Sequence, residues 1–317
     1  MNLVEFGDWS PKTWSELSAD EWESRLLSVC GRFHPTPVDD FYKVTGDVVL
    51  QNASGLELAR VSNNLSIIRR DEKDIRLDFG GNFFLVIQIE GACGVELNGR
   101  QSEIGPGDCI LLDSSTPLLL NFDGRFSDHL SVHLPRQLLL SEKGTDLEVS
   151  RRLGVEDPMS AVLRALIAKI SRTSAENAKA PHLRQLLFQA TRQAFARDAD
   201  LHQPLANSSD GRLEAAQLLI DRHLTEECLS LAWLARRLGV SARTLQNDFN
   251  RIDATVTSLI RTRRLFLVRD RLAEMRNRTG DATIAEVAYS TGFNDISYFN
   301  RSFKEAFLQS PRDFLKG

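Results

Sequence analysis

Two short stretches in the last third of the chain carry side chains that can form paired hydrogen bonds with the edges of DNA bases. Arginine can contact guanine in this way, and glutamine or asparagine can contact adenine. At the spacing of one helix face, the first stretch presents Arg243, Gln246, Asn247 and Asn250. The second presents Ile296, Ser297, Asn300 and Arg301, of which Ile296 can contact only a thymine methyl or a sugar. We expect all of these residues to contact DNA.

Each stretch belongs to a local pattern that occurs twice: an apolar helical segment, a turn centred on a glycine, and a second short helix. The first copy spans residues 231–249 around Gly239, and the second spans residues 284–303 around Gly292. A repeated pattern of this kind predicts two helix-turn-helix units, each of which places one recognition helix in the major groove.

Local signals indicate where each recognition helix begins and which face it buries. Ser241 and Asp295 are favourable N-caps for the two helices. The inner faces are expected to carry two pairs of residues at a spacing of four, Leu245 with Phe249 and Phe299 with Phe303. A single helical hairpin often serves packing alone, but two such units with polar outer faces favour DNA binding.

A long helix from about Val256 to Met275 is expected to join the two units. Asp270 and Glu274 indicate that part of its surface is simply solvated. Several cations on this helix are candidates for phosphate contacts, namely Arg261, Arg263, Arg264, Arg269 and Arg271.

The charge of the chain is divided unevenly. The net charge is −4, but residues 210–317 hold 17 Lys and Arg against 14 Asp and Glu, a net charge of +3, and the remainder carries −7. Of the C-terminal cations, 15 are arginine, the side chain suited to two-point contacts with phosphate and guanine. The division predicts moderate non-specific affinity for DNA, beside an acidic domain that discourages indiscriminate binding.

The length and composition of the chain indicate a two-domain cytoplasmic protein. Among its 317 residues no apolar run is long enough to span a membrane, and residues 1–16 lack the features of a secretory signal. The four cysteines, Cys30, Cys93, Cys109 and Cys228, lie far apart, which fits neither a disulfide framework nor a zinc site. We expect reduced, mostly buried thiols and no membrane partner.

Residues from about 40 to 136 predict a β-rich domain. Short apolar runs alternate with turn residues, including Asn98-Gly99, a strong hairpin signal. The expected strands are Leu56–Ser62, Leu65–Arg69, Phe83–Glu90, Gly94–Leu97, Cys109–Asp113, Leu118–Phe122 and His129–Leu134. Many short antiparallel strands at this spacing favour a closed barrel or a jelly roll.

Two amphipathic helices are expected after the strands, at Met159–Ser171 and His182–Arg197. At least one should pack on its own domain, while the other suits either packing or a dimer surface. The polar segment Asp198–Arg212 is the expected linker. The fold class is therefore α+β with two domains: a β-barrel with helices at 1–198, a linker at 199–212, and an all-α domain with two helix-turn-helix units at 213–317.

The C-terminal segment resembles the DNA-binding domain of the AraC/XylS family of bacterial transcription regulators. The matching motifs are Leu231-x-x-Leu234-Ala235, Ser241-x-Arg243-x-Leu245-x-x-x-Phe249, Arg261-x-x-Arg264-Leu265, Ile284-Ala285-x-x-Ala288, Gly292-Phe293-x-x-x-Ser297-Tyr298-Phe299-x-Arg301-x-Phe303-Lys304 and Ser310-Pro311. The chain departs from the family at four positions. The family often has Arg or Lys where this chain has Asn247, Gly where it has Asp253 and Leu308, and Tyr where it has Leu259. Asn247 should alter the base preference, and Leu308 should affect the turn after the second unit.

The N-terminal part resembles the cupin-type sensor domains of the same family, and most closely those of FeaR-like activators of aromatic-amine catabolism. The matching residues are Val29-Cys30-Gly31-x-Phe33, Val86-x-Gln88-x-x-Gly91, Gly107-Asp108-x-x-Leu111-Leu112-Asp113-x-x-x-Pro117 and Leu134-Pro135-Arg136-x-Leu138-Leu139. The resemblance implies an inducer such as an aromatic amine or its aldehyde product. Candidate residues lining its pocket are Phe84, Val86, Gln88 and Asp113, with plain barrel core the favoured role for the first two.

Cupin enzymes hold a metal through a His-x-His pair with further Glu and His ligands. The corresponding region of this chain, Asn82–Glu90, contains no histidine. His129 and His133 are four residues apart on one expected strand and could face the same side, but ordinary barrel or surface roles are favoured over a metal pair. No Ser/His/Asp set, phosphate-binding loop or dinucleotide motif is apparent in the sequence. We expect no metal, no cofactor, no catalytic residue and no enzyme activity.

The sequence therefore predicts a cytoplasmic, nucleoid-associated and sequence-specific regulator that activates catabolic genes in response to a small molecule. Its expected partners are double-stranded promoter DNA, RNA polymerase, the inducer and a second copy of the chain. Two alternatives stay open. One is a dimeric regulator that needs no ligand, and the other, less favoured, is a cupin-type enzyme fused to a DNA-binding domain.

Overall fold

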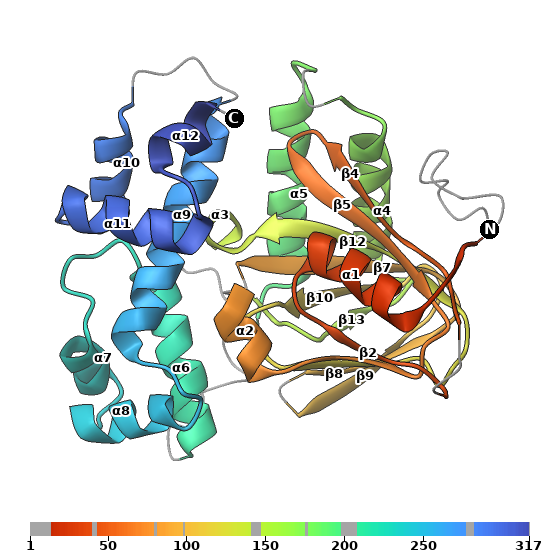
Figure 1. The fold of residues 1–317 in the computed structure, drawn as a ribbon, viewed down its shortest axis with the longest axis horizontal. Helices are drawn as coiled ribbons and strands as arrows, with labels where there is room; N and C mark the ends of the chain where they lie inside the picture. Colours follow the sequence, from red (N-terminus) through yellow and green to blue (C-terminus); the bar gives the residue numbers. More distant parts are fainter. Residues whose placement is uncertain are drawn as a thin grey trace. The chain divides into compact units, whose positions relative to one another are not determined.

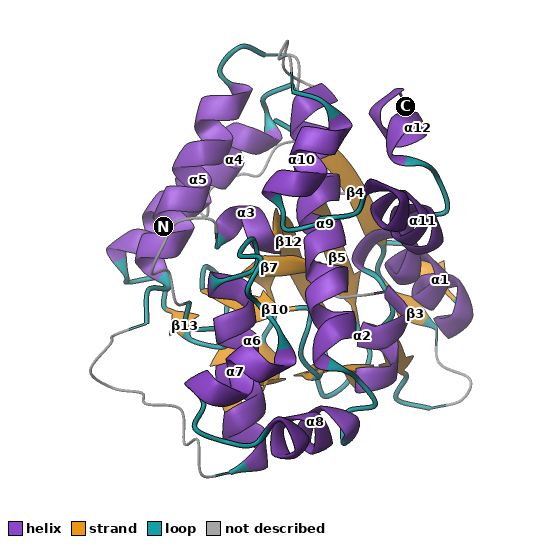
Figure 2. Cartoon of the chain, turned by 90° about the vertical axis from the view of Figure 1, so that its left-hand side faces the viewer, coloured by secondary structure: helices purple, strands orange, loops and turns teal. Residues whose placement is uncertain are grey.

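The computed structural model describes residues 14–39, 43–78, 81–97, 99–140, 147–174, 177–197, 208–276 and 282–316. Apart from Leu140, the described residues divide into an N-terminal unit that ends at Arg197 and a C-terminal unit that begins at Ser208. Every described strand belongs to the N-terminal unit, whereas the C-terminal unit is helical (Figures 1 and 2). The α+β architecture expected from the sequence is confirmed.

Two antiparallel sheets form the β-rich part of the N-terminal unit, with strand orders β13-β10-β7-β12-β5-β4 and β2-β6-β11-β8-β9. The first consists of β4 (Val48–Ala53), β5 (Leu56–Asn63), β7 (Asn82–Glu90), β10 (Cys109–Asp113), β12 (Ser127–Pro135) and β13 (Arg152–Leu153). The second consists of β2 (His34–Thr36), β6 (Ile67–Arg70), β8 (Cys93–Leu97), β9 (Arg100–Ile104) and β11 (Leu118–Asn121). A separate pair joins β1 (Glu16–Leu17) to β3 (Val44–Thr45), and two short helices are α2 (Glu72–Asp78) and α3 (Arg136–Leu139).

The central strands β7, β10 and β12 are buried along nearly their whole length. Alternate residues of these strands face opposite sides of the sheet, and Phe84, Val86 and Leu112 enter the core that both sheets share. The helix α4 (Pro158–Ser171) lies against the start of β10, where Ser160 Oγ donates a hydrogen bond of 3.1 Å to the Gly107 carbonyl. The apolar runs of these strands follow from burial on both faces.

The helix α1 (Ala19–Cys30) contributes Trp22 and Leu26 to the same core. The Trp22 indole Nε1 donates a hydrogen bond of 3.0 Å to the Ser62 carbonyl, which fixes the helix to β5. This helix was not expected from the sequence, because Trp22 and Leu26 are its buried residues and make a weak periodic signal. Its start did carry a signal, since Ser18 and Glu21 form a capping box.

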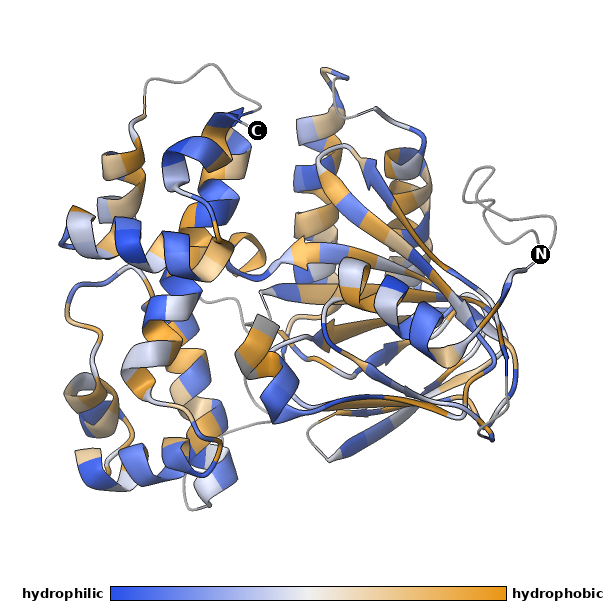
Figure 3. Ribbon diagram, in the orientation of Figure 1, coloured by the Kyte–Doolittle hydropathy of each residue, from blue (hydrophilic) through white to orange (hydrophobic). Residues whose placement is uncertain are grey.

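All seven expected strands are present, as β5, β6, β7, β8, β10, β11 and β12, with ends within two residues of those expected. The sequence missed β4 and β9, among others. The missed strand β9 is mostly polar and lies at the edge of its sheet, so its apolar alternation is weak (Figure 3). The strands β8 and β9 pair as the predicted hairpin requires, with Leu97 opposite Arg100, while Asn98 of the predicted Asn98-Gly99 turn lies outside the described residues.

Both amphipathic helices expected after the strands are present, as α4 and α5 (Ala180–Ala194). They pack against each other, and α4 also contacts β4. The outer side of α5 leaves Leu186 exposed at 50%. Packing on the N-terminal unit therefore accounts for α4, and the outer face of α5 stays a candidate dimer surface.

The C-terminal unit contains α6 (Ser209–Arg222), α7 (Leu231–Arg237), α8 (Ala242–Asn250), α9 (Val256–Arg276), α10 (Ile284–Ser290), α11 (Ile296–Phe307) and α12 (Pro311–Lys316). Two separate apolar cores form around α7 with α8 and around α10 with α11. The long helix α9 belongs to both, because Ile260 enters the first core and Val268 the second. None of the helices in the described residues is long and apolar enough to cross a membrane.

Residues 208–212, which the sequence assigned to the linker, are instead the cap and first turn of α6. Ser208 Oγ accepts a hydrogen bond of 3.0 Å from the Gly211 amide. Arg212 makes an ion pair of 2.7 Å with the buried Asp248 carboxylate on α8. These polar residues resemble a linker in composition, but Asp248, the partner of Ser209 and Arg212, lies 39 and 36 residues away from them and is invisible in a local pattern. Residues 198–207 of the expected linker lie outside the described residues.

One arginine on α9 connects the two helix-turn-helix units. The Arg264 guanidinium donates hydrogen bonds to the carbonyls of Leu224 at 2.9 Å, Glu226 at 2.9 Å and Gly292 at 2.8 Å. Leu224 and Glu226 precede the first unit, and Gly292 forms the turn of the second. Gly292 has a φ of +93°, and a Cβ atom there would lie 2.7 Å from Arg264 Cζ, so only glycine permits this approach.

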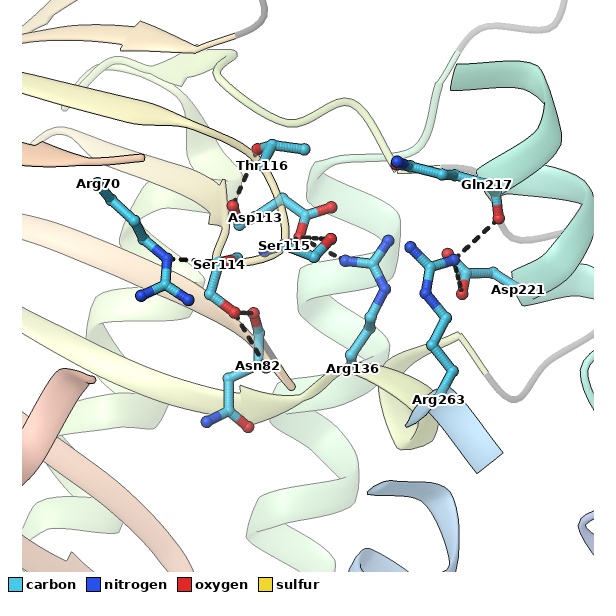
Figure 4. A network of polar contacts seen from close by, with 10 residues as sticks. All are labelled: Arg70, Asn82, Asp113, Ser114, Ser115, Thr116, Arg136, Gln217, Asp221 and Arg263. Carbon is cyan, nitrogen blue, oxygen red and sulfur yellow. Dashed lines mark hydrogen bonds and ion pairs between the residues drawn. The ribbon is translucent and has the colours of Figure 1, made fainter. Parts of the chain in front are cut away.

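Other arginines of α9 that were candidates for phosphate contacts also serve the fold. Arg263 is buried and donates to the Asp221 carboxylate at 2.5 Å and to the Gln217 carbonyl at 3.0 Å (Figure 4). Arg269 pairs with Asp270 at 2.8 Å, and Arg271 donates to Ser290 at 2.7 Å. The expectation of phosphate contacts is therefore wrong for Arg263 and loses support for Arg264, Arg269 and Arg271.

Two positions where the related family often has glycine adopt left-handed backbone in this chain. Asp253 has a φ of 49° and Leu308 a φ of 59°. Aspartate tolerates this conformation, whereas leucine is strained in it. Leu308 is the C-cap of α11 and is 89% exposed, so no packing of its side chain offsets the strain.

Replacing Arg264 with methionine should destabilise the C-terminal unit by at least about 2 kcal/mol, because three carbonyls lose a charged donor. Urea unfolding of the full chain, followed by far-ultraviolet circular dichroism, measures the change. Arg261→Met is the matched control, since the Arg261 side chain on the same helix makes no hydrogen bond or ion pair within the described residues. Equal losses in the two variants would contradict the role assigned to Arg264.

Leu308→Gly should stabilise the chain by about 1 kcal/mol, because glycine removes the left-handed strain at a small entropic cost. The midpoint of thermal unfolding should rise accordingly. Gln309→Gly, at the neighbouring exposed position with no positive φ, should give no rise. A lowered midpoint for Leu308→Gly would contradict the strain argument.

Candidate DNA interface and ligand cavity

The recognition helix of the first unit, α8, is held by a cap and by two apolar anchors. Ser241 Oγ accepts a hydrogen bond of 3.0 Å from the Thr244 amide. Leu245 and Phe249 are fully buried in the first helical core. The N-cap and the inner face predicted from the sequence are confirmed, so packing determines which residues face outward.

The outer side of α8 carries the four residues expected to contact DNA. Arg243, Asn247 and Asn250 are exposed, and Gln246 is half-buried. Gln246 Nε2 donates a hydrogen bond of 2.9 Å to Asn250 Oδ1, so these two amides orient each other. Within the described residues, the side chains of Arg243 and Asn247 make no hydrogen bond or ion pair, which leaves their polar atoms available to an external partner.

The recognition helix of the second unit, α11, is built in the same way. Asp295 Oδ1 accepts a hydrogen bond of 2.9 Å from the Tyr298 amide, and Phe299 and Phe303 are fully buried. Both features match the sequence prediction. Of its four candidate contact residues, three are exposed: Ser297, Asn300 and Arg301.

The fourth candidate on α11, Ile296, differs from the expectation that it faces outward. Its side chain is half-buried and packs against the second helical core. An apolar side chain in the first turn of α11 lowers the free energy of the folded chain when it is buried in that core and not exposed to water. Part of Ile296 is therefore unavailable for a contact with a thymine methyl.

Three exposed side chains near the recognition helices were not singled out in the sequence. Tyr298 on α11 is 40% exposed, beside Ser297. Arg236 and Arg237 are exposed at the end of α7, and the Arg237 guanidinium lies 4.8 Å from the centre of the Trp233 ring. The sequence offered a signal for the two arginines, because they are adjacent and lie just before the Gly239 turn. Cations at that place can contact DNA phosphates.

The core of the N-terminal unit contains a cavity of about 40 Å³ between α1 and the two sheets. Ten of its lining residues are apolar side chains or a thiol: Leu26, Cys30, Phe33, Val61, Ile68, Phe84, Val86, Leu112, Leu118 and Leu120. The other two, His129 and Ser131, are polar and come from alternate positions of β12, which face the same side of the sheet. The volume is enough for a few water-sized groups.

His129 is the unusual residue of this cavity. It is 6% exposed, and its Nδ1 atom is buried without a hydrogen-bond partner. Burial lowers the pKa of the imidazole to about 4, against a small opposing effect of the Asp128 carboxylate. The ring is therefore neutral near pH 7.

His133, the second histidine of β12, has a different environment. Its Nε2 atom lies 3.7 Å from Cys30 Sγ, its Nδ1 atom lies 3.3 Å from a Glu57 carboxylate oxygen, and its ring packs on Phe84. Burial raises the pKa of the Cys30 thiol to about 12, so Cys30 is not a thiolate nucleophile at neutral pH. No cluster of three or more His, Cys, Asp or Glu side chains within the described ranges could hold a metal ion.

Two of the four residues proposed from the sequence as pocket lining, Phe84 and Val86, do line the cavity and also belong to the barrel core. Gln88 and Asp113 are not among its lining residues. Gln88 Nε2 donates to the Glu90 carbonyl at 2.7 Å and to Ser127 Oγ at 2.8 Å. Both polar side chains are engaged in the scaffold, which the alternation pattern by itself did not reveal.

Asp113 belongs to a polar network at the end of β10 (Figure 4). Arg136 Nη1 donates to Asp113 Oδ1 at 2.5 Å, and the Ser115 amide donates to the same oxygen at 2.8 Å. Although burial opposes it, the Arg136 charge and these hydrogen bonds hold the pKa of Asp113 below its usual value. Beside it, Arg70 Nε donates to the Ser114 carbonyl at 3.0 Å.

Comparison with known proteins gives matches to both units. A helix-turn-helix domain model matches residues 234–317, and an AraC-binding-like domain model matches residues 22–199. The chain is 26% identical to the transcriptional activator RhrA of Rhizobium meliloti (strain 1021) over 315 residues, 96% of this chain and 97% of that protein. It is 25% identical to the transcriptional activator NphR of Rhodococcus sp over 272 residues, 82% of this chain and 78% of that protein. The solved AraC-like transcriptional activator CuxR matches at 14% identity with a TM-score of 0.49, over 86% of this chain and 94% of that one.

The neutral, buried state of His129 has a consequence for stability. Its pKa is about 4 in the folded chain and about 6.5 in the unfolded chain, so the unfolded state binds the proton first as the pH falls. The stability contribution of the neutral ring is complete above about pH 6.5 and is lost progressively towards pH 4. Between pH 7 and pH 5 the wild type should lose about 2 kcal/mol more than His129→Gln.

Urea unfolding of the full chain at both pH values measures this difference. The matched control is His182→Gln, which removes an exposed histidine on α5 and should keep the pH dependence of the wild type. If His129→Gln loses as much stability on acidification as the wild type, the ring is not buried in its neutral form.

Proposed function

Because the chain belongs to the AraC family of transcription regulators, we propose that it activates transcription from promoters that it recognises with α8 and α11. The two recognition helices enter successive major-groove segments on one face of the duplex, about one helical turn or roughly 34 Å apart. A family model that spans residues 22–199 and a second that spans residues 234–317 support the assignment of both units.

One observation carries this proposal: two capped helices of one unit present exposed polar side chains whose partners are not within the described residues. Arg243 and Asn247 on α8, and Ser297, Asn300 and Arg301 on α11, have this property. A helix surface that served packing alone would bury such groups or pair them with neighbours. In the free chain water solvates these exposed groups, and in the complex base edges and phosphates take the place of that water.

The two helices differ in chemistry, and this difference predicts a division of labour. α8 offers Arg243 together with the Gln246–Asn250 amide pair, all suited to hydrogen bonds in the major groove. The leading residue of α11, Ile296, is partly engaged in the core. We therefore assign more of the base specificity to α8 and more of the positioning to α11.

The charge distribution supports specific over indiscriminate binding. The segment from residue 210 onward has a net charge of only +3, and the rest of the chain carries −7. Phosphate contacts then provide moderate affinity, and base contacts must provide the preference for a site.

The N-terminal unit is assigned the role of a sensor whose ligand occupies the cavity beside His129. By resemblance to FeaR-like activators, the signal is an aromatic amine or its aldehyde, and the regulated genes are catabolic. RhrA and NphR are named as transcriptional activators, which supports activation through RNA polymerase by this chain as well. We assign the exposed outer face of α5 around Leu186 to contact with a second copy.

Genome-wide mapping of bound sites, repeated with aromatic amines and aldehydes in the medium, tests the function directly. A defined motif upstream of catabolic genes, with transcription that falls when the chain is deleted, is the expected result. Uniform coverage of the genome, or unchanged transcription after deletion, would refute regulation by sequence-specific binding.

Alanine substitution of Arg243 or Gln246 should cost about 1–3 kcal/mol on the mapped site and little on a scrambled duplex, because a base contact is lost. Fluorescence anisotropy with both duplexes at one salt concentration measures the two affinities. Arg125→Ala removes the same charge from an exposed position of the N-terminal unit and should change neither. A loss of equal size on both duplexes would mean that the residue contacts phosphate instead.

A further inference from the structure

The cavity of the N-terminal unit has one polar wall. His129 and Ser131 lie on β12, whereas the residues from α1 and the other strands present apolar side chains and the Cys30 thiol. None of the residues lining the cavity carries a carboxylate, an ammonium or a guanidinium group. Any ligand inside it therefore meets mostly hydrocarbon, with hydrogen-bonding groups on one side.

The His129 imidazole has an unmet hydrogen bond at this wall. Its Nδ1 atom is buried without a partner, and the ring makes no hydrogen bond within the described residues. A buried polar group without a partner costs about 1–3 kcal/mol, so a leucine would fill this position more favourably if packing were its only role. A ligand that hydrogen-bonds to the ring recovers that cost.

The charged groups around β12 are already engaged elsewhere. Asp128 pairs with Arg60 Nε at 3.0 Å in a buried ion pair, and it faces away from the cavity because neighbouring residues of a strand alternate. Arg70 donates to the Ser114 carbonyl at 3.0 Å and to the Arg32 carbonyl at 2.7 Å. Glu57 approaches His133, and its side chain is 52% exposed. No fixed charge therefore faces the His129 ring from inside the cavity.

This arrangement selects against ions. An ammonium group placed beside His129 would be removed from water without a counter-charge, at a cost of several kcal/mol. A carboxylate ligand would meet the same penalty. A hydroxyl or carbonyl group loses far less on burial and can pair with the neutral imidazole, which offers one donor and one acceptor.

We propose that the ligand sensed by this chain is an uncharged molecule with an apolar, preferably aromatic body and one hydroxyl or aldehyde oxygen, which His129 binds. This ligand assignment rests on the sensor role proposed above. Of the two candidate signals, the cavity should bind the aldehyde and exclude the protonated amine. His129 is a specificity-determining residue, and Ser131 is its neighbour on the same wall.

The cavity is too small for an aromatic ligand as it stands. At about 40 Å³ it is smaller than a benzene-binding cavity of about 150 Å³, so an aromatic ligand must widen it. The strands that line it are hydrogen-bonded to neighbours, whereas α1, which supplies Leu26 and Cys30, is held largely by side chains. We therefore expect α1, rather than a strand, to move when a ligand enters.

Three probes of similar shape test whether the cavity prefers a neutral polar, a charged or an apolar group: benzyl alcohol, benzylamine and ethylbenzene. Calorimetric titration of each into the full chain at pH 7 compares a hydroxyl, an ammonium and a methyl group at the same place. Benzyl alcohol should bind at least about tenfold more tightly than ethylbenzene, which corresponds to one hydrogen bond to a buried partner. Benzylamine should bind most weakly, because it is a cation at this pH.

Two variants assign the selectivity to the imidazole. His129→Leu should remove the preference for benzyl alcohol over ethylbenzene, while His129→Gln, which keeps a donor and an acceptor, should retain it. His182→Gln, on an exposed face of α5, is the control and should behave as the wild type. Unfolding midpoints of all variants establish that each is folded, and His129→Leu should not be less stable than the wild type.

Several outcomes would overturn the proposal: tighter binding of benzylamine than of benzyl alcohol, retention of the alcohol preference in His129→Leu, or no binding of any probe. Binding of the mapped DNA site by the same preparations separates this proposal from the proposed function. Intact DNA binding with the wrong ligand selectivity refutes only the ligand assignment. Correct selectivity without specific DNA binding refutes the regulatory function instead.

Discussion

The three hydrogen bonds of Arg264 are the interaction on which the DNA-reading unit depends. They join the segment before the first helix-turn-helix unit to the turn of the second, across α9. In the binding mode that we propose, the spacing of the two recognition helices must match the spacing of successive groove segments. Burial lowers the pKa of Arg264. An arginine side chain stays protonated in proteins, so the cation is directed at carbonyls. Gly292 provides the room that this arginine needs.

The helix α9 adds a second connection, because it supplies apolar residues to both helical cores. The arginines on this helix illustrate how one residue type divides between roles. Arg263 pairs with Asp221 inside the unit, while Arg243 and Arg301 on the recognition helices have no such partner within the described residues. The side chains that hold the unit together are thus distinct from those available to DNA, and substitutions should separate stability from recognition.

The N-terminal unit follows a different principle: its buried ion pairs are closed, whereas the His129 ring makes no hydrogen bond at all within the described residues. Arg60 pairs with Asp128, and Arg136 with Asp113, in places where an isolated charge would be costly. Against this background, the His129 ring is an exception at the wall of an apolar cavity. We infer the ligand preference of the N-terminal unit from this ring, because neither the sheet topology nor the strand composition specifies one.

Periodicity and turn chemistry predicted most of the elements, and where they failed the cause was physical. The central strands β7, β10 and β12 are continuous apolar runs because they are buried on both faces, so they were recognised. The edge strand β9 and the helix α1 bury few residues and left weak patterns. Ser209 and Arg212 have linker-like composition, yet both bind Asp248 on α8. Gln88 and Asp113 were chosen as polar residues on inner strands, but neighbours distant in the chain engage them within the scaffold.

The sequence by itself determined the two helix-turn-helix units, their caps and, except at Ile296, their inner and outer faces, because these features follow from interactions between residues a few positions apart. It also determined the family to which the chain belongs, through motifs that each occupy a short segment. Only the tertiary structure decided which arginines of α9 serve the fold, which residues surround the cavity and that the His129 ring lacks a partner there. Those properties depend on residues brought together from distant parts of the chain. No local pattern of composition or spacing encodes them.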